Sequence, residues 1–185
     1  MISLHIKIDE EKMANAQKAL AGVKNGAPKA MSRAINRAVK FGKTRSSKLI
    51  RKAYTINAKA VNEATTAYPS TPVTLHGAIS FKSRPKQLRN YAVKRTKKGL
   101  MASVRRSTGF KRLTKRAFYN VIQSGPAYLR RVYDTRYPIE VLHGPAVPQL
   151  ADNTDVEPQL RRDVQKKLNE RLEHEVNSLL RGYVK

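Results

Sequence analysis

Two groups of basic residues have the side-chain type and spacing that could bind a ligand. In the first group, cations recur mostly at three- and four-residue steps between Lys29 and Arg51. In the second, they are crowded between Lys94 and Arg116. Lys and Arg neutralise phosphates without reading bases, so both groups could contact a nucleic-acid backbone. The candidate nucleic-acid-binding residues are Arg33, Arg37, Lys40, Lys43, Lys48, Arg51, Lys94, Arg95, Lys97, Lys98, Arg105 and Arg106.

The overall charge favours an anionic partner for these groups. The chain has 185 residues, with 38 Lys and Arg against 13 Asp and Glu, for a net charge of +25. Glu63 is the only acid between Lys12 and Tyr133. A solvated helix face normally includes Glu four residues from Lys, and none occurs between Lys12 and Tyr54. We therefore favour phosphate contact for the first group, with an anionic partner subunit as the alternative.

Aromatic residues are sparse in the second basic group. From Tyr91 to Arg116 the aromatic residues are Tyr91 and Phe110, so stacking of unpaired bases has little support there. If this group contacts nucleic acid, we expect duplex or backbone contact without sequence readout.

The residues that could catalyse a reaction are scattered. The four histidines show no spacing typical of metal ligands, and cysteine is absent. Asp134 and Glu140 are the only acids in the strand-rich region, too few for a metal-dependent nuclease. The sequence therefore predicts a non-enzymatic protein with no catalytic residues, no metal site and no cofactor.

The N-terminal half predicts a strand and helices that carry the first basic group. Residues 2–8 alternate in polarity as in a half-buried strand. Asp9 is placed to cap a helix with Glu10 and Glu11 in its first turn. Pro28 opens a second helix, on which an apolar stripe and the cationic stripe fall on roughly opposite sides. Its small residues, Ala30, Ala34, Ala38 and Gly42, would let another backbone approach closely.

The rest of the chain predicts short strands and a final helix. Asn57 is placed to cap a short helix over 58–64, and strands are expected at 73–82, 100–106, 117–122, 128–133 and 139–142. Residues 94–99 are expected to be an exposed hairpin connection and 144–153 a linker. A four-step apolar stripe predicts a helix from about Val156 to Gly182.

The predicted fold class is therefore α+β. It has an N-terminal strand and helices, a small, mostly antiparallel sheet, and a long C-terminal amphipathic helix. We expect residues 1–150 to form one domain, with 151–185 packing on it or on a neighbouring subunit. The first nine residues lack the features of a signal peptide, and no stretch approaches the roughly 18 apolar residues that a membrane span requires.

One segment resembles a known family signature. Residues 138–149 read PIEVLHGPAVPQ, close to the LPI-x-x-L-x-GPS-VPQ signature of the prophage minor tail protein Z family, a tail completion component of lambda-like tailed phages. This chain has Ala146 where the family often has Ser. Shorter similarities, AINRA at 34–38 and TKKG at 96–99, extend the resemblance over nearly the whole length. The residues that carry the structural signature are Phe118, Pro138, Ile139, Leu142, Gly144, Pro145, Val147 and Pro148.

The resemblance implies a structural protein of the virion, made in the host cytoplasm. It places residues 1–150 among small neck and tail-completion domains, which usually form rings at the head-proximal end of the tail. The implied partners are copies of the same chain, other tail or neck proteins (tail terminator, tube, tape measure or connector) and the DNA end, without a membrane. The alternative is a general non-sequence-specific nucleic-acid-binding module of the ribosomal or chromatin type, which explains the charge but not the signature.

Overall fold

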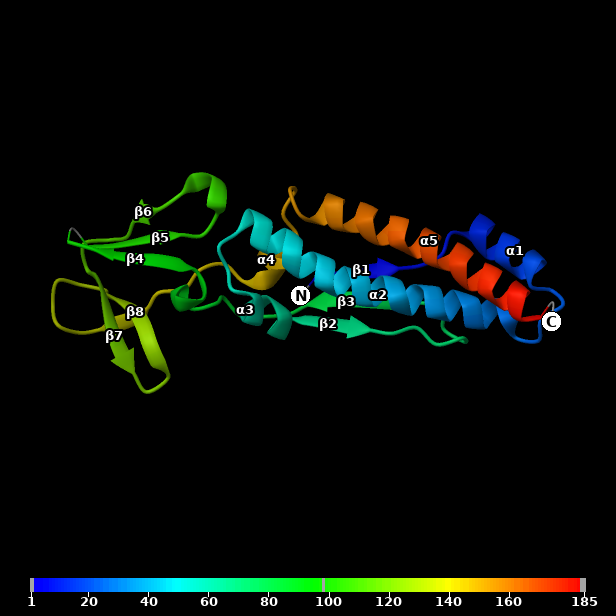
Figure 1. Ribbon diagram of the computed structural model, residues 1–185. Helices are drawn as coiled ribbons and strands as arrows, with labels where there is room; N and C mark the ends of the chain where they lie inside the picture. Colours follow the sequence, from blue (N-terminus) through cyan, green and yellow to red (C-terminus); the bar gives the residue numbers. More distant parts are fainter. Residues whose placement is uncertain (1, 98, 184–185) are drawn as a thin grey trace. The chain divides into compact units, whose positions relative to one another are not determined.

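The computed structural model describes residues 2–97 and 99–183 and has an α+β fold (Figure 1), as the sequence predicted. The chain divides into two compact units. The helical unit comprises the described residues of Met1–Ser46, Thr65–Phe81 and Glu157–Lys185. The sheet-rich unit comprises those of Ser47–Ala64 and Lys82–Val156.

A three-stranded antiparallel sheet lies in the helical unit. Strand β3 (Gly77–Phe81) is central, between β1 (Ile2–Ile6) and β2 (Thr65–Tyr68). Leu4 pairs with Ile79, so both side chains lie on the same face, and both are buried. The exposed His5 lies on the opposite face. The alternation predicted for the first strand is confirmed and results from burial of one face only.

Three helices complete this unit: α1 (Glu10–Ala19), part of α2 (Gly26–Ala53), and α5 (Glu157–Tyr183), which runs alongside α2 (Figure 1). Helix α1 begins after Asp9 as predicted, but the Asp9 side chain makes no capping hydrogen bond. The carboxylates of Asp9, Glu10 and Glu11 stabilise the N-terminus of α1, because negative charge there interacts favourably with the helix dipole.

Small residues on α2 allow its neighbours to approach closely, as the sequence suggested. Ala30, Ala34 and Ala38 are completely buried. A Cβ added at Gly42 would lie 2.4 Å from Cδ1 of Ile79 in β3 and 2.9 Å from Cγ2 of Val164 in α5. Gly42 is therefore needed where α2 meets both of these elements.

The sheet-rich unit holds two further sheets, each antiparallel. One has the order β4 (Ala92–Thr96), β5 (Gly99–Ser103), β6 (Lys111–Arg112), and the other β7 (Ala117–Ile122), β8 (Gly125–Arg131), β9 (Ile139–Val141). Helix α3 (Ala58–Glu63), two single 3₁₀ turns (Leu88–Asn90 and Arg106–Thr108) and α4 (Val147–Ala151) accompany them. Asn57 caps α3 as predicted, accepting a hydrogen bond of 2.8 Å from the Ala60 amide.

Three expectations about this part of the chain are corrected in detail. The described strands form three small sheets instead of one, because each short strand pairs only with near neighbours in sequence or with β3. The expected connection at 94–99 is shorter than predicted: residues 94–96 belong to β4, whose Thr96 pairs with Gly99 of β5, so the two strands do form a hairpin. Strand β4 is an edge strand, where exposed basic side chains discourage pairing with other chains. The expected linker contains α4, since Pro148 occupies its first turn and Val147 and Leu150 are buried.

Helix α4 lacks a side-chain cap. Ala146 occupies the N-cap position and offers no side-chain oxygen, although Gln149 Oε1 accepts a 2.9 Å hydrogen bond from the Ala146 amide. Ala146→Ser is expected to raise the free energy of unfolding by about 1 kcal/mol, because the hydroxyl can accept from a first-turn amide. Urea denaturation measures this change. Ala151→Ser, the same substitution at the other end of α4, is the control, and an equal gain there would contradict the capping explanation.

Candidate nucleic-acid interface

The cationic stripe of α2 is exposed, as its periodicity predicted. In the helical unit, Arg33, Arg37 and Lys40 face solvent and Lys43 is half-buried, whereas Met31, Ile35 and Val39 are buried. Positions three or four residues apart lie on the same side of a helix, so the two sets occupy different faces. In the sheet-rich unit, Lys48 and Arg51 of α2 are likewise exposed beside the buried Leu49 and Ile50.

Arg33 and Arg37 have an intramolecular partner that the sequence did not reveal. Arg37 Nε lies 3.0 Å from Oε1 of Glu175 on α5, and Arg33 Nη1 lies 3.8 Å from Oε2. The Glu175 side chain is only 5% exposed, while those of the arginines are about half exposed. Oε1 accepts no hydrogen bond, so the contact with Arg37 is an ion pair without hydrogen-bond alignment. These two arginines therefore compensate a buried charge in addition to facing solvent.

Four other candidate cations of α2 are available to an external anion, whereas Arg45 is paired with Asp163. Within the described part of the chain, the side chains of Lys40, Lys43, Lys48 and Arg51 make no hydrogen bond or ion pair. Each can contact a phosphate without breaking an internal interaction.

Arg105 and Arg106 stabilise the sheet-rich unit itself. Arg105 forms an ion pair with Asp155. Arg106 Nε donates a 2.9 Å hydrogen bond to the carbonyl of Arg51 in the last turn of α2, where the helix dipole favours a cation. The structure thus brings Arg106 and Arg51 together through a helix cap.

The cations of β4 lie over aromatic rings. Lys94 Nζ is 4.3 Å from the centre of the Phe110 ring, and the Arg95 guanidinium carbon is 4.4 Å from that of Tyr119. Such contacts hold the charged groups at the surface and leave their outer sides open to an anion. Lys97 is exposed and, within residues 2–97 and 99–183, has no side-chain partner. Lys98 lies outside the described residues.

The signature segment packs against Tyr91. The Gly144 amide donates to the Lys86 carbonyl, and the Leu142 amide to that of Tyr128, each at 2.8 Å. The Tyr91 hydroxyl donates a 2.7 Å hydrogen bond to the Pro145 carbonyl. Burial raises the pKa of Tyr91 above its ordinary value, and Tyr54 adds to the shift. A tyrosine hydroxyl is protonated at neutral pH even at its ordinary pKa, so that of Tyr91 can donate this hydrogen bond.

The other signature residues are also structural. Val147 and Pro148 are buried in the first turn of α4. The Pro138 carbonyl accepts a 3.1 Å hydrogen bond from the Val132 amide, and Ile139 pairs with Arg131 in the last sheet. Phe118 on β7 lies beneath the Arg131 guanidinium, 5.7 Å from ring centre to Cζ. These signature residues thus organise the sheet-rich unit, and none of the eight is of a type that serves as a general acid, base or nucleophile.

Two further features concern catalysis. The structure brings two of the scattered histidines together, with His5 Nδ1 and His76 Nε2 separated by 3.0 Å. Among residues 2–97 and 99–183, no three or more His, Asp or Glu side chains are grouped so as to hold a metal ion.

No helix in the same ranges is both long and apolar enough to cross a membrane.

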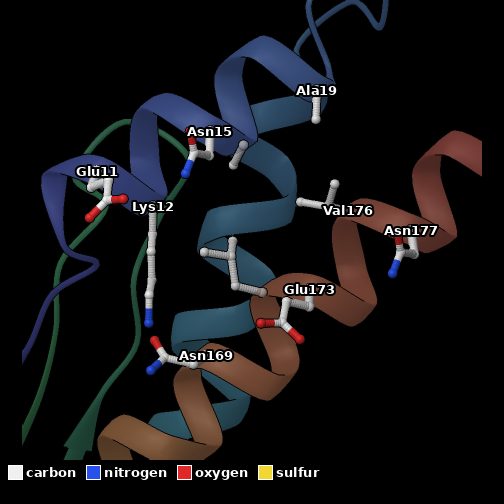
Figure 2. Close-up of a pocket in the computed structure, with 10 residues that line it drawn as sticks. Glu11, Lys12, Asn15, Ala19, Asn169, Glu173, Val176 and Asn177 are labelled. Carbon is white, nitrogen blue, oxygen red and sulfur yellow. The ribbon is translucent and has the colours of Figure 1, made fainter.

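A hollow of about 400 Å³ between α1 and α5 differs in character from the basic surfaces (Figure 2). Its polar lining includes Glu11, Glu173, Asn15 and Asn169, with Lys12 as the one cation. Carboxylates and amides without a surplus of cations do not suit a polyanion, so this hollow is not part of the candidate interface.

The fold and these surfaces define an α+β protein with exposed basic side chains on α2 and β4. The whole sequence, compared with known families, matches the model of prophage minor tail protein Z over residues 12–185, nearly the full length. The chain belongs to that family of phage minor tail proteins, a structural component of the virion. No curated protein and no solved structure gives a significant match.

Proposed function

We propose that this protein is non-enzymatic and completes the head-proximal end of a phage tail at the head–tail junction, as a homo-oligomeric ring. Its cationic surfaces hold the DNA end by charge, without reading a sequence. Its protein partners are other tail or neck components: the tail terminator, tube, tape measure or connector. The family supports the tail role, and the net charge of +25 supports the contact with DNA.

The observation that carries the DNA contact is the set of α2 cations without internal partners. Lys40, Lys43, Lys48 and Arg51 are spaced along one helix that has no acid over its whole length. Unpaired cations at this density repel one another, and an external polyanion relieves that repulsion. Arg33 and Arg37 contribute less to DNA contact, because each already compensates Glu175.

The binding test is a charge reversal with a matched control. Lys40→Glu, Lys48→Glu and Arg51→Glu are combined in one variant, and Lys7→Glu, Lys18→Glu and Lys24→Glu, all exposed and outside the stripe, in another. The stripe variant is expected to bind a random-sequence duplex about tenfold more weakly, and the slope of log affinity against log salt should fall by about two to three. If both variants lose the same affinity for the duplex, binding depends only on net charge. A defined interface on α2 would then be refuted.

The position in the particle is tested by cryo-electron microscopy of the intact head–tail junction. A ring of this chain at the top of the tail, with the α2 cations toward DNA, is the expected result. If those cations face acidic protein instead, the DNA contact is wrong and the structural role stands. Absence of the chain from the particle would favour a nucleic-acid-binding module that acts outside the virion.

A further inference from the structure

A basic pocket with aromatic walls lies beside β7 and β8, where Lys115 and Arg116 end the second basic group without being among its candidate binding residues. Two hollows of about 310 and 320 Å³ share Lys115, Arg116 and Arg131 in their linings. Phe118 and Tyr133 line the second hollow. The backbone brings the two segments together, because the Arg131 amide donates a 3.3 Å hydrogen bond to the Arg116 carbonyl.

The cations of this pocket differ in how far they are neutralised. Arg116 Nη2 lies 2.7 Å from Asp134 Oδ2, and its Nη1 donates a 3.2 Å hydrogen bond to the Val132 carbonyl. Within the described ranges, Lys115 and Arg131 have no carboxylate partner. Arg116 is thus held in place, while Lys115 and Arg131 are left for an external anion.

The aromatic wall of the pocket offers a ring on which a flat ligand can stack, in addition to the cations that attract an anion. Tyr133 is 62% exposed and, in the part of the chain that the structure describes, makes no hydrogen bond or ring contact. Phe118, by contrast, already lies beneath the Arg131 guanidinium. An exposed ring next to unpaired cations matches a ligand that combines a flat face with an anion. An acidic peptide would use the cations but not the ring.

We propose that this pocket binds an unpaired nucleotide of a single-stranded nucleic acid. Its phosphate contacts Lys115 and Arg131, and its base stacks on Tyr133. The volume of about 320 Å³ is at the lower end of the range typical of small-ligand sites, which suits one nucleotide. Duplex bases are stacked on one another and cannot reach the ring, so the pocket distinguishes single strands from duplex. This inference extends the proposed contact with a DNA end, but rests on different residues.

The test compares two labelled probes by fluorescence anisotropy at one salt concentration: an oligothymidylate of about ten nucleotides and a blunt duplex of similar length. Tyr133→Leu removes the stacking face, Tyr133→Phe keeps it, and Tyr68→Leu replaces a tyrosine of comparable exposure (51%) on β2. Tyr133→Leu is expected to weaken binding of the single strand about tenfold, with duplex affinity unchanged. The other two variants should bind the single strand as the unaltered protein does.

The outcomes separate this proposal from the DNA contact of α2. If the α2 charge reversal weakens duplex binding while Tyr133→Leu has no effect on the single strand, the nucleotide pocket is refuted alone. If the single strand depends on Tyr133 but duplex binding is insensitive to the α2 charges, the pocket stands and the α2 contact is refuted. Binding of a polyglutamate probe that competes with the single strand and is insensitive to Tyr133→Leu would identify an acidic-protein site and overturn the proposal.

Discussion

Replacing Arg33 and Arg37 together with alanine is expected to lower the free energy of unfolding by about 3 kcal/mol. The reason is the burial of Glu175, whose side chain is 5% exposed and whose two oxygens face these arginines at 3.0 and 3.8 Å. Without them, a carboxylate stays in a site that water hardly reaches, and the cost of its desolvation is no longer offset. Denaturant titration of the full chain at neutral pH measures the change.

A third substitution distinguishes this cost from ordinary loss of surface side chains. Adding Glu175→Leu to the double variant removes the uncompensated charge and is expected to recover most of the lost stability. Glu175→Leu alone should cost less than the double variant, because the arginines are about half exposed and remain solvated. A double variant within about 0.5 kcal/mol of the original protein would show that the arginines do not compensate a buried charge.

The pairing with Glu175 illustrates what the sequence could predict and what it could not. The exposed side of α2 follows from local spacing, since a residue three or four positions away lies on the same face. That Glu175, far along the chain, is buried against two of those arginines depends on how α5 packs on α2. The sequence left open whether residues 151–185 pack on the same chain or on a neighbouring subunit. In the structure, Glu175 and Asp163 of α5 pair with arginines of α2 in the same chain.

The strands show the same division between local and long-range information. The bounds of β7, 117–122, agree with the expectation from alternation and turn residues. The pattern does not specify which strands pair, so it could not predict that β3 joins β1 and β2 while the later strands form separate sheets. Strand β2 was missed because Thr65–Tyr68 is short and follows α3 directly.

The pocket beside β7 was missed for a related reason. Along the chain, few aromatic residues occur among the basic residues between Lys94 and Arg116. Pairing of β7 with β8 places Ala117 opposite Arg130, and the residues that flank these two strands bring Phe118 and Tyr133 into one hollow with Lys115 and Arg131. A comparison across a predicted hairpin, by cross-strand register, could have indicated this cluster.

Gly144→Ala is expected to destabilise the sheet-rich unit by about 3 kcal/mol, the largest effect we expect from a single methyl group in the signature. A Cβ at this position would lie 2.5 Å from Cε2 of Tyr91 and 3.0 Å from two other ring carbons. The ring cannot move away cheaply, because Tyr91 is buried and its hydroxyl is bonded to the Pro145 carbonyl. Thermal and urea denaturation of the full chain measure the loss.

The steric explanation predicts a specific coupling between Gly144 and Tyr91. In a Tyr91→Leu background, which removes the ring, Gly144→Ala should cost less than about 1 kcal/mol, although Tyr91→Leu is itself destabilising. Gly22→Ala is the control, because a Cβ there meets no atom within 4 Å. If Gly144→Ala costs the same with and without the Tyr91 ring, the requirement for glycine comes from the backbone. The closeness of Gly144 to Tyr91 would then not explain why the signature contains glycine at this position.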